Sequence, residues 1–223
     1  MSDSVIGTRA LSSVMVVKAD ENSGVNVSTK HITYCTSGMY CNALVTAGLS
    51  DAKVTVVGPF DISGTSALVG AMKAYSVMTG EEISEKTMDT ATDELVTTAE
   101  VAKNVGDKQK VTELVAAAKK AVFEDQLSSE TDIRDAIEQA ANELSIDLSD
   151  DDVEKLTNMM MKVSKEDIDP DTIAKQASDI YNKLKEKGID LANVDTKGLG
   201  EKIGDFFGNI FTAIANFFSG LFG

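Results

Sequence analysis

The fold is decided by residues 25–57, which read VNVSTKHITYCTSGMYCNALVTAGLSDAKVTVV. Residues 25–34 alternate as a strand does, residues 37–47 have the spacing of a helix, and residues 53–57 form a nearly all-apolar strand. Gly48 stands where the left-handed cap of that helix would fall. A strand, a crossover of about ten residues and a second strand are the order that a parallel βαβ unit requires.

A third strand is predicted upstream of this unit. Residues 13–17 (SVMVV) are a short apolar run that ends in a polar turn. In the next strand, at residues 25–34, the side chains of Val25, Val27 and His31 share one face.

Downstream of the unit, the sequence predicts a turn and a second helix. Gly58 and Pro59 are expected to end the preceding strand. Ser63 is expected to cap the helix. The buried face of that helix is predicted to consist of Leu68, Ala71, Met72, Tyr75 and Met78. Residues 1–80 thus predict a small α/β subdomain with three strands.

The sequence changes character near residue 80, from β-branched runs to the spacing of amphipathic helices. The net charge is −15, and residues 1–80 hold five bases and five acids, so the whole excess lies further along the chain. We predict an α/β (α+β) fold in which a small three-stranded α/β layer is followed by an acidic helical bundle and a C-terminal amphipathic helix. The predicted boundaries are 1–80, 81–188, a linker at 189–200 and a tail at 201–223.

Composition excludes several classes of function. A strongly acidic chain lacks the lysine and arginine clusters that sequence-independent binding of nucleic acid needs. His31 is the only histidine, so a histidine-based zinc site or a Ser-His-Asp triad would have to use it. The acids at residues 147–154 fit the first turn of a helix better than a calcium loop, because the midpoint glycine is missing. We predict no catalytic residue, no metal site and no cofactor.

The turn before the second predicted helix is a candidate ligand site. Ser63, Gly64, Thr65 and Ser66 place three hydroxyls and a glycine at the positive end of a helix, where backbone N–H groups can hold an anion. The turn lacks the lysine and glycine spacing of a phosphate-binding loop, and Asp61 would repel an anion. Structural capping and the binding of a small ligand therefore remain alternatives.

The C-terminal tail, residues 201–223, is strongly amphipathic. No charge follows Asp205, and polar side chains such as Asn209 and Asn216 lie on the other face. Its apolar positions recur at three- and four-residue steps: Ile203, Phe206, Phe207, Ile210, Phe211, Ile214, Phe217, Phe218, Leu221 and Phe222. The stripe predicts contact with a membrane surface or a protein partner, packing against the chain itself, or self-association. A true membrane span fits less well, because the uncharged segment is short and contains Asn and Gly.

Several motifs resemble the YpuA-like family of uncharacterised secreted bacterial proteins (domain of unknown function 1002). The similarity extends from about Ile6 to about Ile180 and is densest before Ala74. The motifs that carry it are IGTRALSS at residues 6–13, HIT at 31–33, MYCNALVTAG at 39–48, DAKVTV at 51–56 and PFDISGTSALVGAMKA at 59–74.

The resemblance implies export but supplies no catalytic residues, because the activity of the family is uncharacterised. This sequence departs from the family pattern at Gly38, where an acid is usual, and at Ser66, where alanine is usual. It also starts close to the Ile-Gly-Thr-Arg motif, so we expect either a trimmed N-terminus or a shortened paralogue. Nothing in residues 1–20 has the basic segment and apolar core of a signal peptide.

The two cysteines, Cys35 and Cys41, are five residues apart across a predicted strand-to-helix turn. Export would allow them to form a disulfide, and the alternative is two separately buried thiols. A catalytic pair is not expected, because the spacing is not Cys-x-x-Cys and no lysine or arginine is close in sequence.

These observations predict a secreted, non-enzymatic interaction protein of the cell envelope, attached to a membrane or a partner through its C-terminal amphipathic helix. The alternative is a small-ligand-binding or enzymatic α/β domain with its site at the helix that follows Ser63. Truncation after Gly198 distinguishes the two.

Overall fold

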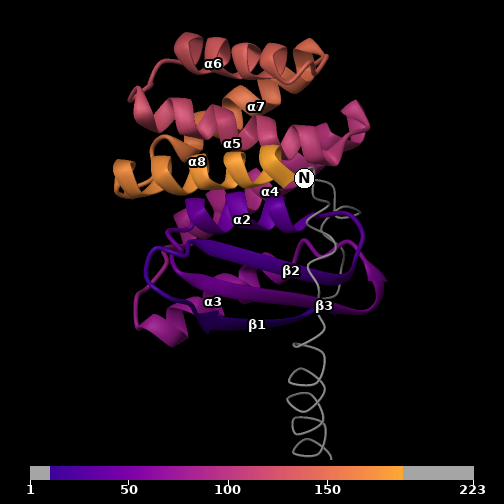
Figure 1. Cartoon of the computed structure of the whole chain (residues 1–223), viewed down its shortest axis with the longest axis vertical. Helices are drawn as coiled ribbons and strands as arrows, with labels where there is room; N and C mark the ends of the chain where they lie inside the picture. Colours follow the sequence, from indigo (N-terminus) through magenta and orange to yellow (C-terminus); the bar gives the residue numbers. More distant parts are fainter. Residues whose placement is uncertain (1–10, 188–223) are drawn as a thin grey trace, which may run out of the picture. The chain divides into compact units, whose positions relative to one another are not determined.

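The computed structural model describes residues 11–187, which form a three-stranded sheet and helices α2 to α8 (Figure 1). The elements are β1 (Ser13–Lys18), β2 (Val25–Ile32), α2 (Ser37–Thr46), β3 (Ala52–Ile62), α3 (Ala67–Thr79), α4 (Glu85–Val105), α5 (Lys108–Glu124), α6 (Glu130–Glu143), α7 (Asp150–Val163) and α8 (Pro170–Lys187). The predicted α+β class is confirmed.

The sheet has the strand order β1-β3-β2. β2 runs parallel to β3, and α2 is the crossover between them, so the predicted βαβ unit is confirmed. Thr36 caps α2 by accepting a hydrogen bond from the backbone of Met39, and Gly48 follows the helix with a φ of +80°. β1 pairs with the other side of β3 and is antiparallel to it.

β3 continues through Gly58 and Pro59 to Ile62, so the prediction that these two residues end the strand is wrong. Pro59 lies beyond the last β1 pair, Ser13 with Val57, and inside a register shift with β2. Its missing N–H therefore removes no ladder hydrogen bond, which is why the strand tolerates it.

The register shift explains a second difference from the sequence prediction. His31 has a φ of +57° at the irregularity of β2, and its half-exposed ring leaves the face that Val25 and Val27 share. A Cβ on Gly58 would lie 2.7 Å from the carbonyl oxygen of His31, so this close approach requires a glycine.

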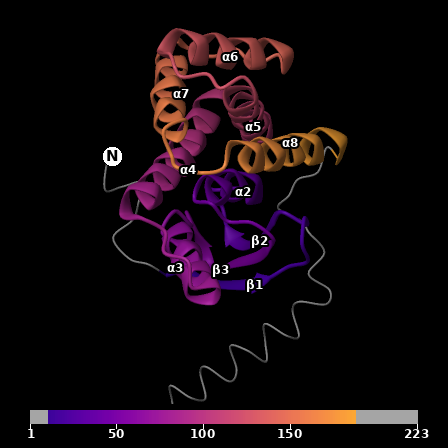
Figure 2. The ribbon, with the colours of Figure 1, turned by 90° about the vertical axis from the view of Figure 1, so that its left-hand side faces the viewer.

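Helices α2 and α3 cover one face of the sheet (Figures 1 and 2). Val16, Val27 and Val54 form one cross-strand row on this face, and a Cβ on Gly70 of α3 would lie 3.5 Å from Val14. Val27 and Val54 are buried in the core, and Val16 packs against it.

Helices α4, α5 and α8 pack on α2, and α6 and α7 lie beyond them (Figure 2). Four of these helices have the N-terminal caps that their sequences supply: the side chains of Ser84, Asp107, Ser129 and Ser149 each accept a backbone hydrogen bond. α8 begins at Pro170, and the side chain of Asp169 before it accepts a hydrogen bond from the backbone N–H of Thr172.

One hydrophobic core runs through both the sheet layer and the helices. Leu44, Leu68, Leu95 and Leu114 are fully buried members of it. Gly80 ends α3 with a φ of +79°, and the core continues past that residue. Residues 11–187 belong to one compact unit, while the predicted linker at 189–200 and the tail at 201–223 lie outside the described residues.

Candidate functional site

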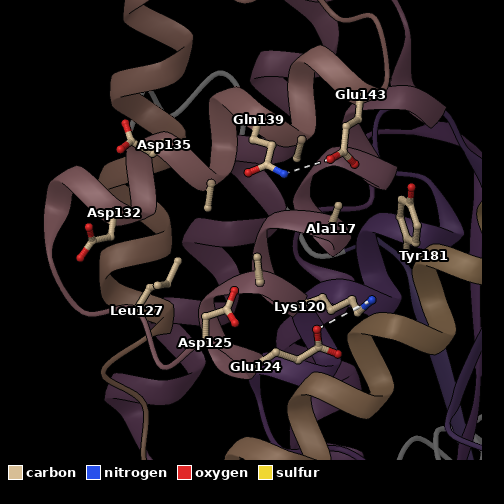
Figure 3. Close-up of a pocket in the computed structure, with 13 residues that line it drawn as sticks. Ala117, Lys120, Glu124, Asp125, Leu127, Asp132, Asp135, Gln139, Glu143 and Tyr181 are labelled. Atoms are coloured by element: carbon tan, nitrogen blue, oxygen red, sulfur yellow. Dashed lines mark hydrogen bonds and ion pairs between the residues drawn. The ribbon is translucent and has the colours of Figure 1, made fainter.

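A groove lies between α5 and α6, with one side chain of α8 at its end (Figure 3). Its volume is about 420 Å³, within the range of protein binding clefts. The floor is apolar and consists of Ala117, Ala121, Leu127, Ala136 and Ala140. We call this surface the α5–α6 groove.

The sequence of the two helices creates the groove. Ala117 and Ala121 are four residues apart on α5, and Ala136 and Ala140 are four residues apart on α6, so each pair lies on one helical face. A turn at residues 125–129 brings the helices together, and Gln126 adopts a φ of +53° in it. Because alanine side chains are short, the surface between the helices is hollow.

The rim of the α5–α6 groove is strongly acidic. Its carboxylates belong to Glu124, Asp125, Asp132, Asp135 and Glu143. Lys120 is the one basic residue in the lining, and its ammonium lies 3.8 Å from Glu124. The groove therefore carries a local excess of negative charge that attracts cations.

The rim carboxylates differ in their hydrogen bonds. Asp132 accepts from the Ser129 hydroxyl at 2.6 Å, and Glu143 accepts from the Gln139 amide at 3.1 Å. Asp125 and Asp135 make no side-chain hydrogen bond or ion pair with the residues that the structure describes. These two carboxylates can therefore accept donors from a ligand without losing an existing contact.

The polar side chains of the lining are carboxylates, one lysine, one glutamine and one tyrosine. Its thirteen residues include no histidine, cysteine, serine or threonine. Tyr181 of α8 supplies an aromatic ring at one end of the groove (Figure 3).

A buried ion pair lies deep in the core, away from this surface. Lys119 of α5 and Glu94 of α4 are fully buried, and the ammonium lies 2.7 Å from the carboxylate. Lys119 also donates to the carbonyl of Asn42 and to the hydroxyl of Thr46, both on α2, at 2.7 Å each. Burial lowers the pKa of Lys119, and the contact with Glu94 opposes that shift. The ion pair and these hydrogen bonds connect α2, α4 and α5.

A second polar cluster joins the start of α4 to the segment between α7 and α8. The carboxylate of Glu166 accepts hydrogen bonds from Thr87 at 2.8 Å and Thr90 at 2.9 Å, and it lies 3.2 Å from the ammonium of Lys86. Burial alone would raise the pKa of Glu166, but these three partners outweigh it and hold the pKa below its ordinary value.

The turn predicted as a ligand site has a structural environment. Tyr40 donates a hydrogen bond to the carbonyl of Gly64, and the side chain of Ile32 lies against the same glycine. The helix begins at Ala67 with Ser66 as its N-cap, so the prediction that Ser63 caps it is wrong. Thr65 is buried, and ligand binding at Ser63–Ser66 stays a prediction.

The two cysteines are buried free thiols in the structure. Burial raises the pKa of Cys35 to about 12, and Cys41 donates to the carbonyl of Val25. The raised pKa opposes thiolate formation at Cys35, so this residue does not resemble a reactive cysteine. The single histidine, His31, contacts only the exposed carboxylate of Asp61 among the interactions that the structure describes, at 3.1 Å.

The acids at residues 147–154 have capping and pairing roles. Ser149 caps α7 and donates to Asp152, Asp152 accepts from Asn104, and Asp151 pairs with Lys155. Within residues 11–187, no group of three histidine, cysteine or acidic side chains is arranged to hold a metal ion.

The α5–α6 groove was missed by sequence reasoning, which predicted only an acidic helical bundle at residues 81–188. The alanine spacing on each helix was visible, but nothing in the sequence shows which helix faces which. The predicted contact residues of the tail, from Ile203 to Phe222, lie outside the described part of the chain.

Comparisons with known proteins give a family without an assigned activity. Residues 1–180 match the family described as "Protein of unknown function (DUF1002)". The "Uncharacterized protein YpuA" of Bacillus subtilis (strain 168) is 38 % identical over 220 residues, which cover 98 % of this chain and 74 % of that protein. The search of solved structures found no significant match.

Between residues 11 and 187, no helix has both the length and the apolarity that a membrane span requires. The family match covers most of the chain, and the relative from Bacillus subtilis matches along nearly all of it. The resemblance seen in the sequence motifs is therefore confirmed, and the chain belongs to the DUF1002 family of YpuA-like proteins.

Proposed function

We propose that the chain is a secreted, non-enzymatic interaction protein of the cell envelope, attached to a membrane surface or a partner through residues 201–223. The observation that carries the proposal is the tail sequence, in which ten apolar side chains recur at helical steps and no charge follows Asp205. The described helices and sheet have a continuous core of their own, which supports a separate use for this stripe.

The α5–α6 groove supports the interaction role independently of the tail. It combines an apolar floor with an acidic rim, and two of the rim carboxylates, Asp125 and Asp135, have no described side-chain partner. A concave surface of this kind can bind another molecule, which supports the proposed interaction role. Secretion is supported by the family resemblance alone.

Vesicle sedimentation tests the attachment. We expect the full chain to pellet with phosphatidylglycerol–phosphatidylcholine vesicles and the chain truncated after Gly198 to stay in the supernatant. The reason is that each buried phenylalanine ring contributes about 1.5–3 kcal/mol, and the truncation removes six of them. Equal sedimentation of both chains refutes attachment through the tail.

Matched substitutions show whether the apolar stripe is responsible. Phe211→Asp with Phe218→Asp places two charges on the stripe, and Asn209→Asp with Asn216→Asp places the same two charges on the polar face. We expect the first pair to abolish sedimentation and the second to preserve it. Loss with both pairs would mean that charge, rather than the stripe, controls binding. Recovery of the native protein from cytosol after cell fractionation would refute the proposed location.

A further inference from the structure

We propose that the α5–α6 groove docks an amphipathic helix of a partner protein, with small apolar side chains along one face and lysine or arginine beside them. This inference rests on the proposed interaction role, but not on membrane attachment. The evidence is the combination of an alanine floor, an acidic rim and two carboxylates without described partners.

The floor favours a helix as the occupant. Ala117 and Ala121 on one side, and Ala136 and Ala140 on the other, remove side-chain bulk where a third helix would approach. The lining on α6 extends from Asp132 to Glu143, which at 1.5 Å per residue is roughly 17 Å, or about three helical turns. Small apolar side chains of the partner would fill this hollow, as in other helix-in-groove complexes.

The rim determines the charge of the occupant. Five carboxylates and one lysine line the groove, and Lys120 is already close to Glu124. A partner helix with lysine or arginine beside its apolar stripe would give Asp125 and Asp135 the donors that they lack in the structure. Acidic or neutral helices would leave this negative charge uncompensated.

Charge also argues against two occupants from this chain itself. A second copy brings a net charge of −15 toward an acidic groove, and the two molecules repel each other. The tail, residues 201–223, has Lys202 as its only base, together with the acids Glu201 and Asp205. A basic segment of another protein matches the rim better than either.

Peptide binding to the full chain tests the proposal. The probe is a fluorescein-labelled 14-residue helix of alanine and lysine, with the lysines on both sides of an alanine stripe. The control peptide has the same composition, but its lysines are spread evenly around the helix. Fluorescence anisotropy at about 150 mM salt should show tighter binding of the striped peptide, because only that peptide can place alanine on the floor and lysine on the rim. Equal binding of the two peptides overturns the proposal.

Protein variants separate the groove from general electrostatics. Asp125→Asn with Asp135→Asn should raise the Kd of the striped peptide about tenfold, because two charge pairs are lost. Glu81→Gln with Glu82→Gln removes the same charge from exposed positions outside the groove and should leave the Kd nearly unchanged. An equal loss with both pairs means nonspecific attraction and overturns the proposal.

Filling the floor gives a test that does not change the charge. Ala136→Leu places a larger side chain in the groove at a half-buried position, so it should weaken binding of the striped peptide at unchanged net charge. Unchanged binding overturns docking on the floor. If the wild-type chain dimerises and Ala136→Leu abolishes the dimer, a second copy occupies the groove. If truncation at Gly198 tightens peptide binding, the tail occupies the groove. Either result overturns the assignment to a partner.

The peptide-binding experiments contain no vesicles, so their failure would not affect the conclusion of the vesicle-sedimentation experiment. Conversely, a chain that binds the striped peptide but not vesicles would retain the docking surface and lose the proposed membrane attachment. The two proposals therefore fail separately.

Discussion

Lys119 and Glu94 show how much of this core depends on a single pair of charged residues. The ammonium of Lys119 has three partners, one on α4 and two on α2, and both charged side chains are fully buried. We predict that Lys119→Met lowers the free energy of unfolding by about 3–5 kcal/mol, because it leaves the carboxylate of Glu94 buried without a cation. Urea unfolding followed by circular dichroism measures the loss.

Lys120 offers a matched control for this prediction. It is adjacent in sequence and partly exposed, and its contact with Glu124 is long, so Lys120→Met should change stability by less than about 1 kcal/mol. Adding Glu94→Leu to Lys119→Met should recover part of the lost stability, because the unpaired charge is removed. Similar losses for Lys119→Met and Lys120→Met would contradict the role assigned to the buried pair.

The buried pair was not predictable from the sequence, because lysine and glutamate side chains are normally exposed. Only the packing of α4 and α5 on α2 brings Glu94, Lys119, Asn42 and Thr46 together. Local features were more predictable: the caps Ser149 and Asp169 and the left-handed Gly48 follow from residue types at helix ends.

At the scale of elements, Glu166 connects the segment after α7 to the first turns of α4. Its hydrogen bonds come from Thr87 and Thr90, and its ion pair comes from Lys86. We predict that Glu166→Gln costs about 1.5–3 kcal/mol at pH 7, because hydrogen bonds to a charged acceptor are strong. Asp167→Asn, at an exposed neighbouring position, should cost little.

The pKa of Glu166 sets how the stability lost in Glu166→Gln depends on pH. Because the folded pKa is lower than the ordinary value of 4.5, folding favours the ionised form, and the stabilisation is complete above that value. The difference in unfolding free energy between the wild type and Glu166→Gln should therefore be constant near neutral pH. It should shrink as the pH falls through 4.5 and below. A difference that grows on acidification would contradict the assigned contacts.

The order of strands and helices was predictable, but two boundaries and one face were not. Pro59 is expected to end a strand, but it lies where β3 has no ladder bond to lose. His31 leaves its predicted face because of the register shift in β2, and α3 starts after Ser66 rather than after Ser63. Each difference depends on a neighbouring strand or helix, which local pattern does not reveal. The α5–α6 groove was missed for the same reason.

At the scale of the whole molecule, charge is distributed unevenly along the chain. The net charge is −15, and residues 1–80 are neutral on balance, so the excess belongs to residues 81–223. In the described helices some of it is compensated by surface ion pairs, such as Lys155 with Glu100 and Lys162 with Asp93. The rim of the α5–α6 groove is an exception, because five carboxylates there face one lysine. The same charge that would attract a basic partner therefore repels itself when no partner is bound.

This balance leads to a prediction about salt. Self-repulsion of the excess carboxylates is screened by salt, and so is the attraction within surface pairs, but exposed pairs contribute little. We therefore expect the free energy of unfolding to rise by about 0.5–1 kcal/mol between 10 and 200 mM NaCl. The urea midpoint should rise with it. Urea is the suitable denaturant, because guanidinium chloride is itself a salt. Asp125→Asn with Asp135→Asn should reduce this rise more than Glu81→Gln with Glu82→Gln, because the first pair belongs to the crowded rim. A midpoint that falls with added salt would mean that the ion pairs, rather than the repulsion, dominate.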